Sequence, residues 1–354
     1  MTGIALLGAG IFAREEHLPA IEAAPSLTLK AVYSRSQKSA EALAAASRDP
    51  SSVAVYFDSP AVEGRSLDDL LRRDDVAAVS VVLPILQQPA VVEKALRAGK
   101  HVLSEKPVAA TVADAVRLVG WYESLAGAPK PLWGVAENWR YLDSLRYAAQ
   151  RVREIGGDLV SFRLEKYASI APDNKYLNTE WRKVPQHQGG FLLDGGVHFV
   201  AGLRFLLAAA GQEVTKLAGF SALVDKALVP VDTVHAAAVT RGGQSGTIVI
   251  SFGTQFKSGT VVEIVTTKGA VSWSPTEVRT VAGNGDGSGG KVEERRGFPY
   301  SSGVTEEVAA FANGLAAGKL DDFQSPREAL KDLEILQALL ESGDGGAAVK
   351  DLSL

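Results

Sequence analysis

Six short apolar runs recur through the first 136 residues, with a helix-forming stretch between most neighbouring runs. They lie at residues 4–7, 27–32, 53–57, 77–83, 101–103 and 132–136. The runs are rich in Val, Leu and Ala and lack the polar alternation of a strand with one wet face, which favours a parallel sheet covered by helices on both sides. We therefore expect the first part of the chain to be a doubly wound α/β domain.

The pattern changes near Asp143, where a helical stretch begins that runs to about Ile155. Alternating strand-like segments follow at residues 159–167, 233–240, 247–252 and 261–266. A Gly-containing turn, RGGQ at 241–244, links two of these segments as in a hairpin. We expect a second α/β domain built on a large, open, mostly antiparallel sheet.

The length of the chain sets the number of domains. A chain of 354 residues is too long for one ordinary hydrophobic core, and the change of pattern predicts domains at residues 1–127 and 128–354. Ser66, with Asp69 three residues later, is a helix-start signal, and another helix is expected to begin at Ser325-Pro326. The sequence NGDGSGG at 284–290 predicts a flexible surface loop.

Composition excludes several classes of protein. The net charge is −4 and no sustained Lys/Arg run occurs, which argues against a nucleic acid or an anionic membrane as the main partner. The chain has no cysteine, so disulfides and thiolate metal sites are excluded. The first residues predict a buried strand rather than a signal peptide, and no membrane-spanning stretch is expected. We expect a cytoplasmic protein that acts on a small molecule.

A glycine motif directly follows the first predicted strand: Gly8-Ala9-Gly10-Ile11-Phe12-Ala13. This is the G-x-G-x-x-A form of the dinucleotide fingerprint, in which glycines let a pyrophosphate approach a helix N-terminus. We expect Gly8, Gly10, Ile11 and Phe12 to bind the cofactor. The alternative is a plain glycine turn, but its place at the first strand-to-helix connection of a repeated series favours the nucleotide.

The end of the second predicted strand indicates which nucleotide is bound. An NAD enzyme places an acidic residue there to hold the ribose 2′-hydroxyl. Here the chain reads Tyr33-Ser34-Arg35-Ser36, and a hydroxyl with a guanidinium suits a 2′-phosphate. We predict NADP, bound by Ser34 and Arg35. The alternative is that Arg35 is a solvated residue at the start of a helix.

Ser104-Glu105-Lys106-Pro107 follows the fifth predicted strand. In a doubly wound sheet, residues beyond the carboxyl ends of the strands face the ligand crevice, which would place Glu105 and Lys106 by the cofactor. A lysine there can polarise or protonate a substrate oxygen. Taken alone, this tripeptide would more often be an ordinary Glu/Lys turn.

The sequence GGFLLDGGVH at 189–198 places Asp194 and His198 four residues apart among four glycines. On a helix this spacing puts both side chains on one face. The glycines would let a backbone or a flat ligand come close. Two alternatives remain: a surface pair without function, and a divalent metal shared by Asp194, His198 and His187. No further cluster supports the metal, so we predict none.

These motifs occur together, in order: GAGIFA, AGKHVLSEKP (98–107), ENWRY (137–141) and GGFLLDGGVH. The combination resembles the glucose-fructose oxidoreductase, inositol dehydrogenase and MocA-like family over essentially the whole chain. It is most similar to a fungal NADP-dependent branch, through GIFAREEHLP (10–19) and NKYLNTEWRKVPQHQGGFLLDGGVH (174–198). The resemblance implies a Rossmann domain followed by an α/β domain whose open sheet forms a binding-site wall and a homodimer face.

The resemblance also implies roles for individual residues. Lys106, Asp194 and His198 correspond to catalytic residues of the family, with Asp194 and His198 also binding substrate. Further cofactor contacts are expected from Leu83, Pro84, Asn138, Trp181 and Arg182, and further substrate contacts from Tyr141 and Tyr176. The alternative for the aromatic residues in this part of the chain, Trp139 included, is that they belong to the core.

The chain departs from the family pattern at two places. Many members have Pro-Asn-x-x-His after the fourth strand, where this chain has Pro84-Ile85-Leu86-Gln87-Gln88. Ile85 cannot make the hydrogen bonds of an amide, so cofactor contacts there must come from the backbone or elsewhere. The family's triple glycine is also reduced, because Gln188 precedes Gly189 and Gly190.

The activity implied is reversible hydride transfer between NADP(H) and a carbonyl or hydroxyl carbon of a sugar, polyol or related molecule. His198 would exchange the proton, Asp194 would orient the imidazole or the substrate hydroxyls, and Lys106 would stabilise the developing alkoxide. Two alternatives remain: an NADP-sensing regulator without turnover, and an enzyme that keeps NADP bound and transfers hydride between two sugars. The other histidines are expected to be structural or solvated: His17, His101 and His235.

Overall fold

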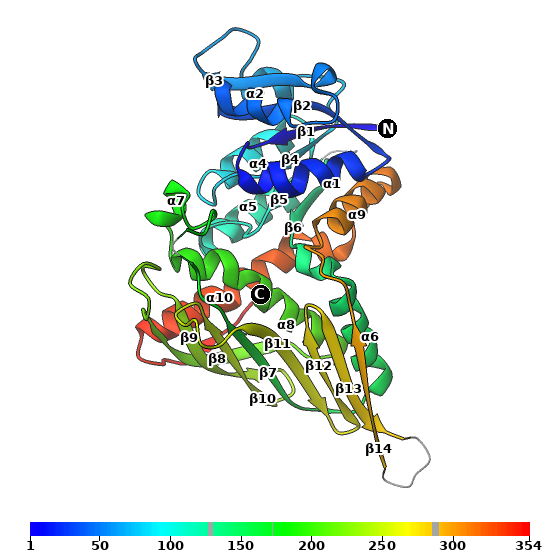
Figure 1. The fold of residues 1–354 in the computed structure, drawn as a ribbon, viewed down its shortest axis with the longest axis vertical. Coiled ribbons are helices and arrows are strands. Elements are labelled where there is room, and N and C mark those ends of the chain that lie inside the picture. Colours follow the sequence, from blue (N-terminus) through cyan, green and yellow to red (C-terminus); the bar gives the residue numbers. More distant parts are fainter. Residues whose placement is uncertain (127–129, 172, 285–289) are drawn as a thin grey trace. The chain divides into compact units, whose positions relative to one another are not determined.

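The computed structural model describes residues 1–126, 130–171, 173–284 and 290–354 (Figure 1). The chain forms two compact units. The first unit is Met1–Asn138 together with Gly303–Leu330, and the second is Trp139–Ser302 together with Lys331–Leu354. The boundary expected between 127 and 128 lies outside the described residues. The return of the chain to the first unit was not expected.

The first unit is built on a six-stranded sheet in the order β3-β2-β1-β4-β5-β6. All neighbouring strands in it are parallel. This is the strand order of a dinucleotide-binding doubly wound fold, and every expected apolar run is a strand, which confirms the predicted fold class. The strands are β1 (Thr2–Leu7), β2 (Leu27–Ser36), β3 (Ala54–Ser59), β4 (Ala78–Val81), β5 (His101–Glu105) and β6 (Trp133–Ala136).

The helices of the first unit begin where the sequence provides caps. Ser66 and Asp69 form the expected capping box, with Ser66 Oγ accepting from Asp69 N–H at 3.2 Å. Thr111 likewise accepts from Asp114 N–H at 3.1 Å. The helices are α1 (Leu18–Ala23), α2 (Gln37–Ala45), α3 (Leu67–Leu71), α4 (Gln88–Arg97), α5 (Val112–Ser124) and α9 (Val304–Ala317).

Helix α9 completes the core of the first unit although it lies far along the chain. Val304, Val308 and Phe311 are almost fully buried and belong to the same apolar cluster as Leu18 and Ile21 of α1. Burying a Val or Phe side chain stabilises a fold by about 1.5–3 kcal/mol. The first unit is therefore not a contiguous stretch of sequence.

The second unit is built on a nine-stranded sheet in the order β14-β13-β12-β11-β7-β10-β9-β8-β15. Only the β7–β10 pair is parallel within the described residues, so the expected mostly antiparallel sheet is confirmed. The strands are β7 (Leu159–Tyr167), β8 (Val214–Ala222), β9 (Thr233–Thr240), β10 (Ser245–Ser251), β11 (Gly259–Thr266), β12 (Gly269–Ser274), β13 (Glu277–Gly283), β14 (Lys291–Gly297) and β15 (Lys350–Asp351).

Helices cover one face of this sheet, as Figure 1 shows for α6 (Asp143–Ile155) and α8 (Gly190–Ala209). Helix α10 (Pro326–Asp344) packs on α8 through Leu336, and a short helix α7 (Glu180–Lys183) precedes α8. By length and composition α8 could cross a membrane, although no membrane-spanning stretch is expected from the sequence, but most of it is buried within the unit. We interpret α8 as a core helix.

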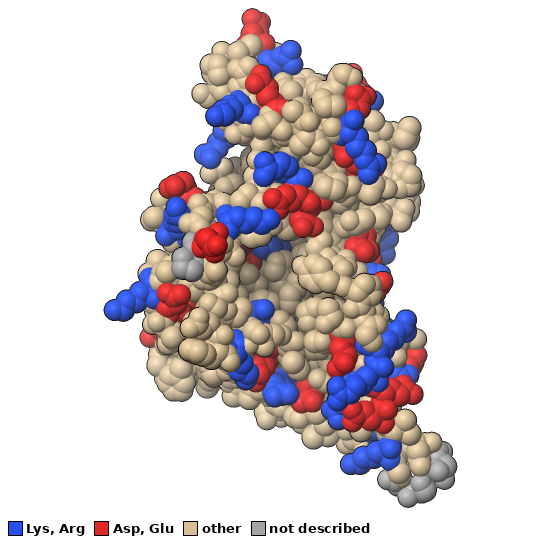
Figure 2. Space-filling view, in the orientation of Figure 1, with Lys and Arg blue, Asp and Glu red and all other residues tan. Residues whose placement is uncertain are grey.

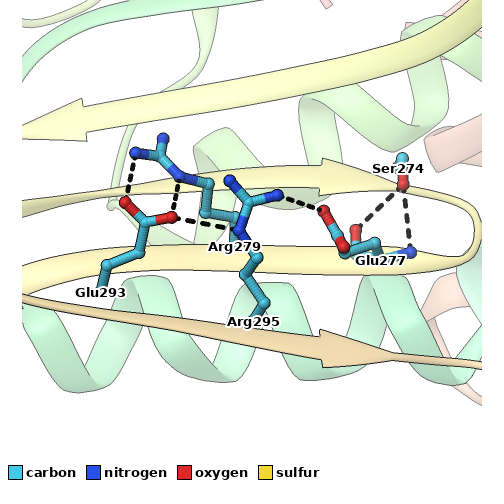
Figure 3. Close-up of polar contacts among 5 residues, drawn as sticks. All are labelled: Ser274, Glu277, Arg279, Glu293 and Arg295. Carbon is cyan, nitrogen blue, oxygen red and sulfur yellow. Dashed lines mark hydrogen bonds and ion pairs between the residues drawn. The ribbon is translucent and has the colours of Figure 1, made fainter.

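Strands β13 and β14 form a hairpin whose surface is charged, and Figure 2 shows acidic and basic side chains intermixed there. Arg279 binds Glu293 with two nitrogens at 2.8 and 2.7 Å, and Arg295 bridges Glu293 and Glu277 at 3.1 and 3.3 Å (Figure 3). Arg279 and Arg295 lower the pKa of Glu293 to about 2. Charges of this kind discourage edge pairing with other chains. Most of the expected 284–290 loop, residues 285–289, lies outside the described residues.

Candidate functional site

The glycine motif forms the turn between β1 and the first helix. Gly8 has φ +114°, and a Cβ there would lie 2.0 Å from the Val82 carbonyl oxygen, so only glycine fits. A Cβ on Gly10 would meet nothing within 4 Å, so the space beside the turn is open. Ala13 is fully buried, which lets the helix pack closely on the sheet. The turn therefore fits a dinucleotide, with Gly10 and the following N–H groups beside the pyrophosphate.

The helix after this motif contains a π-helical turn, Ala13–His17. Such turns are rare and occur frequently at functional sites. The turn directs His17 into the interior, where its side chain is fully buried. Its Nε2 lies 2.7 Å from Glu105 Oε1, and its Nδ1 lies 3.0 Å from Ser80 Oγ. The imidazole thus joins the first helix to β4 and to the end of β5, so His17 has the structural place that was expected.

The backbone on both sides of Lys106 is held by buried side chains. The Lys106 N–H donates to Glu105 Oε2 at 3.2 Å, while the other Glu105 oxygen lies on His17. Gln88 Nε2 donates to the carbonyl oxygens of Glu105 and Pro107 at 2.5 and 3.0 Å. Gln88 stands where the family pattern has histidine, and it braces this turn. Lys106 is therefore fixed at the carboxyl end of β5, where ligands bind in such sheets.

Two more expected cofactor residues lie in the loop after β4. The Leu83 side chain lies beside Gly8, 3.3 Å from the position of a Cβ on that glycine. The Pro84 carbonyl accepts from the N–H groups of Gln87 and Gln88 at 2.9 and 3.2 Å. Ile85 is buried, so its side chain packs in the interior. Any cofactor contact from this loop is left to Leu83, Pro84 and the backbone.

The end of β2 carries Ser34, which is partly exposed, and Arg35, which is exposed. Ser36 caps α2 by accepting from Ser39 N–H at 3.3 Å, so it has a structural role. Tyr33 donates from its hydroxyl to Asp58 Oδ2 at 2.5 Å. Burial and Asp58 raise the pKa of Tyr33, while the nearby Arg35 lowers it. A cationic side chain thus extends from the strand end at which dinucleotide-binding folds hold the adenosine ribose.

In the second unit, Asp194 and His198 lie within α8, so the expected placement on one helix face is confirmed. The role expected of the glycines is confirmed at Gly190, where a Cβ would lie 2.5 Å from the Val229 carbonyl oxygen, so that a backbone does come close. It is wrong for the two glycines between Asp194 and His198. A Cβ on Gly195 would lie 3.3 Å from the Phe252 ring, and one on Gly196 would lie 3.2 Å from Leu336. These glycines admit the unit's own apolar side chains rather than a ligand.

Asp194 is engaged by Arg182 of α7. The two form an ion pair, with Arg182 Nε 2.8 Å from Asp194 Oδ2, and both side chains are largely buried. The guanidinium lies 4.0 Å from the centre of the Trp181 ring and 5.7 Å from that of Tyr176. Four residues named from the resemblance therefore form one cluster, in which Arg182 is held between two rings and a carboxylate.

His198 lies against an aromatic group. Its ring stacks on Trp139 with centroids 5.7 Å apart and planes inclined by 15°. Trp139 contacts Phe199 edge-on at 5.0 Å, and the Lys166 ammonium lies 5.1 Å from the Phe199 centroid. The stack fixes the plane of the imidazole, which a proton-transfer group requires.

Two expected ligand residues are buried. Tyr141 is 3% exposed and lies under Arg146, whose guanidinium is 4.6 Å from its ring centre, which favours packing over substrate contact. Asn138, the last residue of the first stretch of unit one, is 9% exposed.

The remaining histidines have structural or exposed places. His101 Nδ1 accepts from Leu132 N–H at 2.9 Å, and burial lowers its pKa. His235 is exposed on β9. Burial also lowers the pKa of His187, whose Nε2 lies 3.3 Å from the Gly190 carbonyl oxygen. Among the residues that the structure describes, no three His, Cys, Asp or Glu side chains are grouped as a metal site would need.

Lys166 and the bracing role of Gln88 were not predicted from the sequence. For Lys166 a signal existed: in SFRLEKY at 161–167, Phe162, Leu164 and Lys166 share one face of a strand, so a charge follows two core positions. For Gln88 none did, because its partners are carbonyl oxygens of a turn that is 17 to 19 residues away.

Comparison with known proteins agrees with this arrangement. A model described as "Oxidoreductase family, NAD-binding Rossmann fold" matches residues 2–126, and one described as "Oxidoreductase family, C-terminal alpha/beta domain" matches residues 153–350. The chain is similar to Dehydrogenase FPY6 of Fusarium mangiferae, with 51% identity over 350 residues and 99% of each chain.

Two further relatives extend the comparison. A dTDP-3,4-didehydro-2,6-dideoxy-alpha-D-glucose 3-reductase of Streptomyces violaceoruber is 34% identical over 55% of this chain and 51% of that protein. A solved oxidoreductase of Thermotoga maritima is 30% identical, with a TM-score of 0.83 over 99% of this chain and 98% of that one. The resemblance expected from the motifs is confirmed, and the chain belongs to the GFO/IDH/MocA family of oxidoreductases.

Proposed function

We propose that this oxidoreductase uses NADP(H) and acts on a CH–OH or C=O carbon of a sugar, a polyol or a related small molecule. The observation that carries the proposal is the bracing of Lys106. Three buried side chains, His17, Gln88 and Glu105, fix the backbone around one partly exposed lysine in the nucleotide-binding unit. Burying polar groups is costly unless they serve a purpose, and here they position one cation.

The proposed chemistry assigns one task to each group. A bound nicotinamide would supply the hydride acceptor for oxidation of the CH–OH carbon and the hydride donor for reduction of the carbonyl carbon. His198 takes the hydroxyl proton in oxidation and returns it in reduction, and Lys106 stabilises negative charge that develops on a substrate oxygen. Asp194 acts through Arg182, which it holds by the ion pair described above.

The choice of NADP rests on the end of β2. Ser34 and Arg35 offer a hydroxyl and a guanidinium where an NAD enzyme has a carboxylate. A guanidinium forms bidentate bonds with phosphate, so Arg35→Ala is expected to weaken NADPH binding by about 10- to 100-fold and to leave NADH binding nearly unchanged. Fluorescence titration measures both. Lys38→Ala, also exposed on α2, is the control. Equal losses for the two cofactors would contradict the assignment.

The sugar or polyol class rests on relatives. The Streptomyces violaceoruber protein is named as a reductase of a dTDP-linked sugar, and family membership points in the same direction. The test is a screen of sugars, polyols and aldehydes with NADP(H) and NAD(H), followed by cofactor absorbance. Lys106→Met and His198→Asn should each lower kcat by about 100-fold or more. Lys94→Met, an exposed lysine paired with Asp68, is the matched control.

Tight NADPH binding without turnover on any member of the panel would favour the alternative of an NADP-sensing regulator. Full turnover by both variants would contradict the catalytic roles. NADP that stays bound through gel filtration and does not exchange with free cofactor would instead favour hydride transfer between two sugars.

We further propose a cytoplasmic homodimer formed through the open face of the nine-stranded sheet. Phe220 of β8 is 66% exposed, and Val160, at the start of β7 where its register with β11 shifts, is 51% exposed. Apolar side chains on a sheet face suit a protein interface. Light scattering should give a dimer for the native chain and a monomer for the Val160→Glu, Phe220→Glu double variant. A monomeric native chain would contradict this proposal.

A further inference from the structure

Lys166 is a charged residue at a core position of the second unit. It lies on β7, whose alternate residues Phe162 and Leu164 are 3% and 0% exposed. The same alternation places Lys166 with them, facing the helices. Its neighbours across the strands are Ile250 of β10 and Thr260 of β11, which are 0% and 5% exposed. The lysine stem is therefore surrounded by buried groups, while the residue as a whole remains partly exposed.

No acidic side chain that the structure describes balances this charge. Within the described residues, Lys166 forms no ion pair, and its ammonium lies over the Phe199 ring. Burial lowers its pKa, and no nearby carboxylate raises it. The adjacent Glu165 points to the opposite face, where it pairs with Lys257 at 2.7 Å. The Lys166 ammonium is thus partly desolvated, and its contact with the Phe199 ring is the compensating interaction.

Other buried cations of the same unit are neutralised. Arg140 and Arg204 both bind Asp332, at 2.6 and 2.5 Å, and Arg182 binds Asp194 at 2.8 Å. Lys166 differs from these arginines, because folding alone gives no reason to keep its charge. A methionine of similar length would fill the same space without the cost of desolvation.

Lys166 is connected to His198 through two rings. Its ammonium lies on Phe199, Phe199 contacts Trp139, and Trp139 stacks on His198. Phe252 also lies beside Phe199, with centroids 6.1 Å apart. Phe199 and Phe252 are buried, whereas Lys166, Trp139 and His198 are partly exposed. A cation and an imidazole that are both partly exposed and are held by one aromatic group suit a small ligand that carries an anionic group.

We propose that Lys166 binds an anionic oxygen group of the substrate, so that the enzyme acts on an acidic sugar or polyol derivative rather than on a neutral one. This inference rests on the proposed function, because it takes His198 as the proton-transfer group. The anionic group is a carboxylate or a phosphate. Both present the negatively charged oxygens that would pair with the ammonium and replace the water it has lost.

A binding experiment tests this independently of turnover. Calorimetry with NADP⁺ present compares matched probes: glucose with glucuronate, gluconate and glucose 6-phosphate. We expect at least one anionic probe to bind about 10- to 100-fold more tightly than glucose, and the carboxylate and phosphate arms distinguish the two sources of charge. Lys166→Met should abolish that difference. Lys257→Met removes an equal charge that is paired with Glu165, and it should leave the difference intact.

Stability separates a ligand-binding role from a structural one. If Lys166 is kept for binding, Lys166→Met should have an equal or higher melting temperature while it loses the anionic preference. Retention of the preference in Lys166→Met, or failure of the native protein to bind any anionic probe more tightly than glucose, would overturn the inference. If anionic probes bind through Lys166 but none is turned over, the proposed function fails and the binding role stands.

Discussion

His17 shows how one side chain can serve both the fold and the reaction. It bonds to Ser80 and Glu105, and Glu105 in turn accepts from the backbone of Lys106. The π-helical turn is what directs the imidazole inward. The shape of one helical turn is therefore transmitted, through two hydrogen-bonded side chains, to the residue that we propose as the electrostatic catalyst.

Replacement of His17 should affect both stability and turnover. His17→Ala leaves the buried Glu105 carboxylate without its nearest partner, which should lower the free energy of unfolding by about 1.5–3 kcal/mol. It should also lower kcat more than it raises KM, because Lys106 is displaced while substrate groups elsewhere still bind. Urea denaturation and steady-state kinetics measure these effects.

His17→Gln is the informative companion variant, since an amide can still donate to Glu105. It should recover much of kcat. Ser80→Ala, which removes only the weaker partner of the imidazole, should cost about 1 kcal/mol. If His17→Ala lost stability but kept its kcat, the histidine would be structural alone.

The sequence predicts which residues are candidates for the site, but it does not predict which side chains they contact. Asp194 and His198 could be placed on one helix face by spacing alone. The ion pair of Asp194 with Arg182 depends on how the segment before α8 folds back, and no short-range pattern encodes that. Tyr141 was expected at the substrate for its family position, yet the packing of Arg146 covers its ring.

The coupling energy between Asp194 and Arg182 can be measured with a double-mutant cycle. Both partners are mostly buried, so Asp194→Ala and Arg182→Ala should each destabilise the protein, and the double variant should cost less than their sum. We expect a coupling energy of about 1–3 kcal/mol from urea denaturation. Additive effects would mean that solvent, rather than the partner, neutralises the two charges.

Two glycines of helix α8, Gly190 and Gly202, have different structural roles. Gly190 has φ +49°, and a Cβ there would lie 2.5 Å from the Val229 carbonyl oxygen. Gly202 lies in the helix interior, where a Cβ would be 3.6 Å from the Trp139 ring, an ordinary contact. The first glycine is required by the backbone, whereas the second only weakens the helix.

Alanine at these two positions should therefore have opposite effects. Gly190→Ala should destabilise the protein by more than 1 kcal/mol, because the methyl group meets backbone and the positive φ is strained. Gly202→Ala should stabilise it by about 0.5–1 kcal/mol through helix propensity. Thermal unfolding of the two variants provides the comparison. A loss in both would show that α8 has no room for a methyl group at either position.

At the scale of elements, alternation predicted strands where one face is apolar. Strands β7 and β9 begin and end at the expected residues, and the 241–244 hairpin pairs β9 with β10 antiparallel. β14 (KVEERRG) was not predicted because all its residues are exposed. Pairing with β13 and ion pairs stabilise this strand, rather than burial in a core. Burial patterns cannot reveal a strand that buries nothing.

For the whole molecule, stability should depend on pH through two histidines. Burial lowers the pKa of His101 and of His187 below the ordinary value, so the unfolded chain binds their protons more readily. Their contribution is full above the unfolded pKa of about 6.5 and is lost as pH falls. Protonation of His101 would also remove the acceptor for Leu132 N–H.

We therefore expect the melting temperature to fall between about pH 7 and pH 5. The His101→Gln, His187→Gln double variant should have a flatter profile over this range, since glutamine can still accept from Leu132. Calorimetry from pH 5 to pH 8 measures both curves. A native profile that is already flat would mean that neither imidazole is held neutral.

The presence of two units could be predicted from the length and the pattern of the chain. Which segments belong to each unit could not be predicted. Helix α9 carries an ordinary amphipathic sequence, and nothing local assigns it to helix α1, which lies nearly 300 residues earlier. Only the joint burial of Phe311 and Ile21 reveals the assignment.

This discontinuity has a consequence for the order of synthesis. A ribosome that has made the first 138 residues has synthesised every strand of the nucleotide-binding sheet, but not the α9 side chains that close its core. The apolar face of α1 stays open while β7 to β14 emerge, and it is covered only once residues 304–317 have left the tunnel. During that interval the nascent chain exposes an apolar surface that can aggregate. A chaperone that binds this surface would therefore raise the yield of folded enzyme.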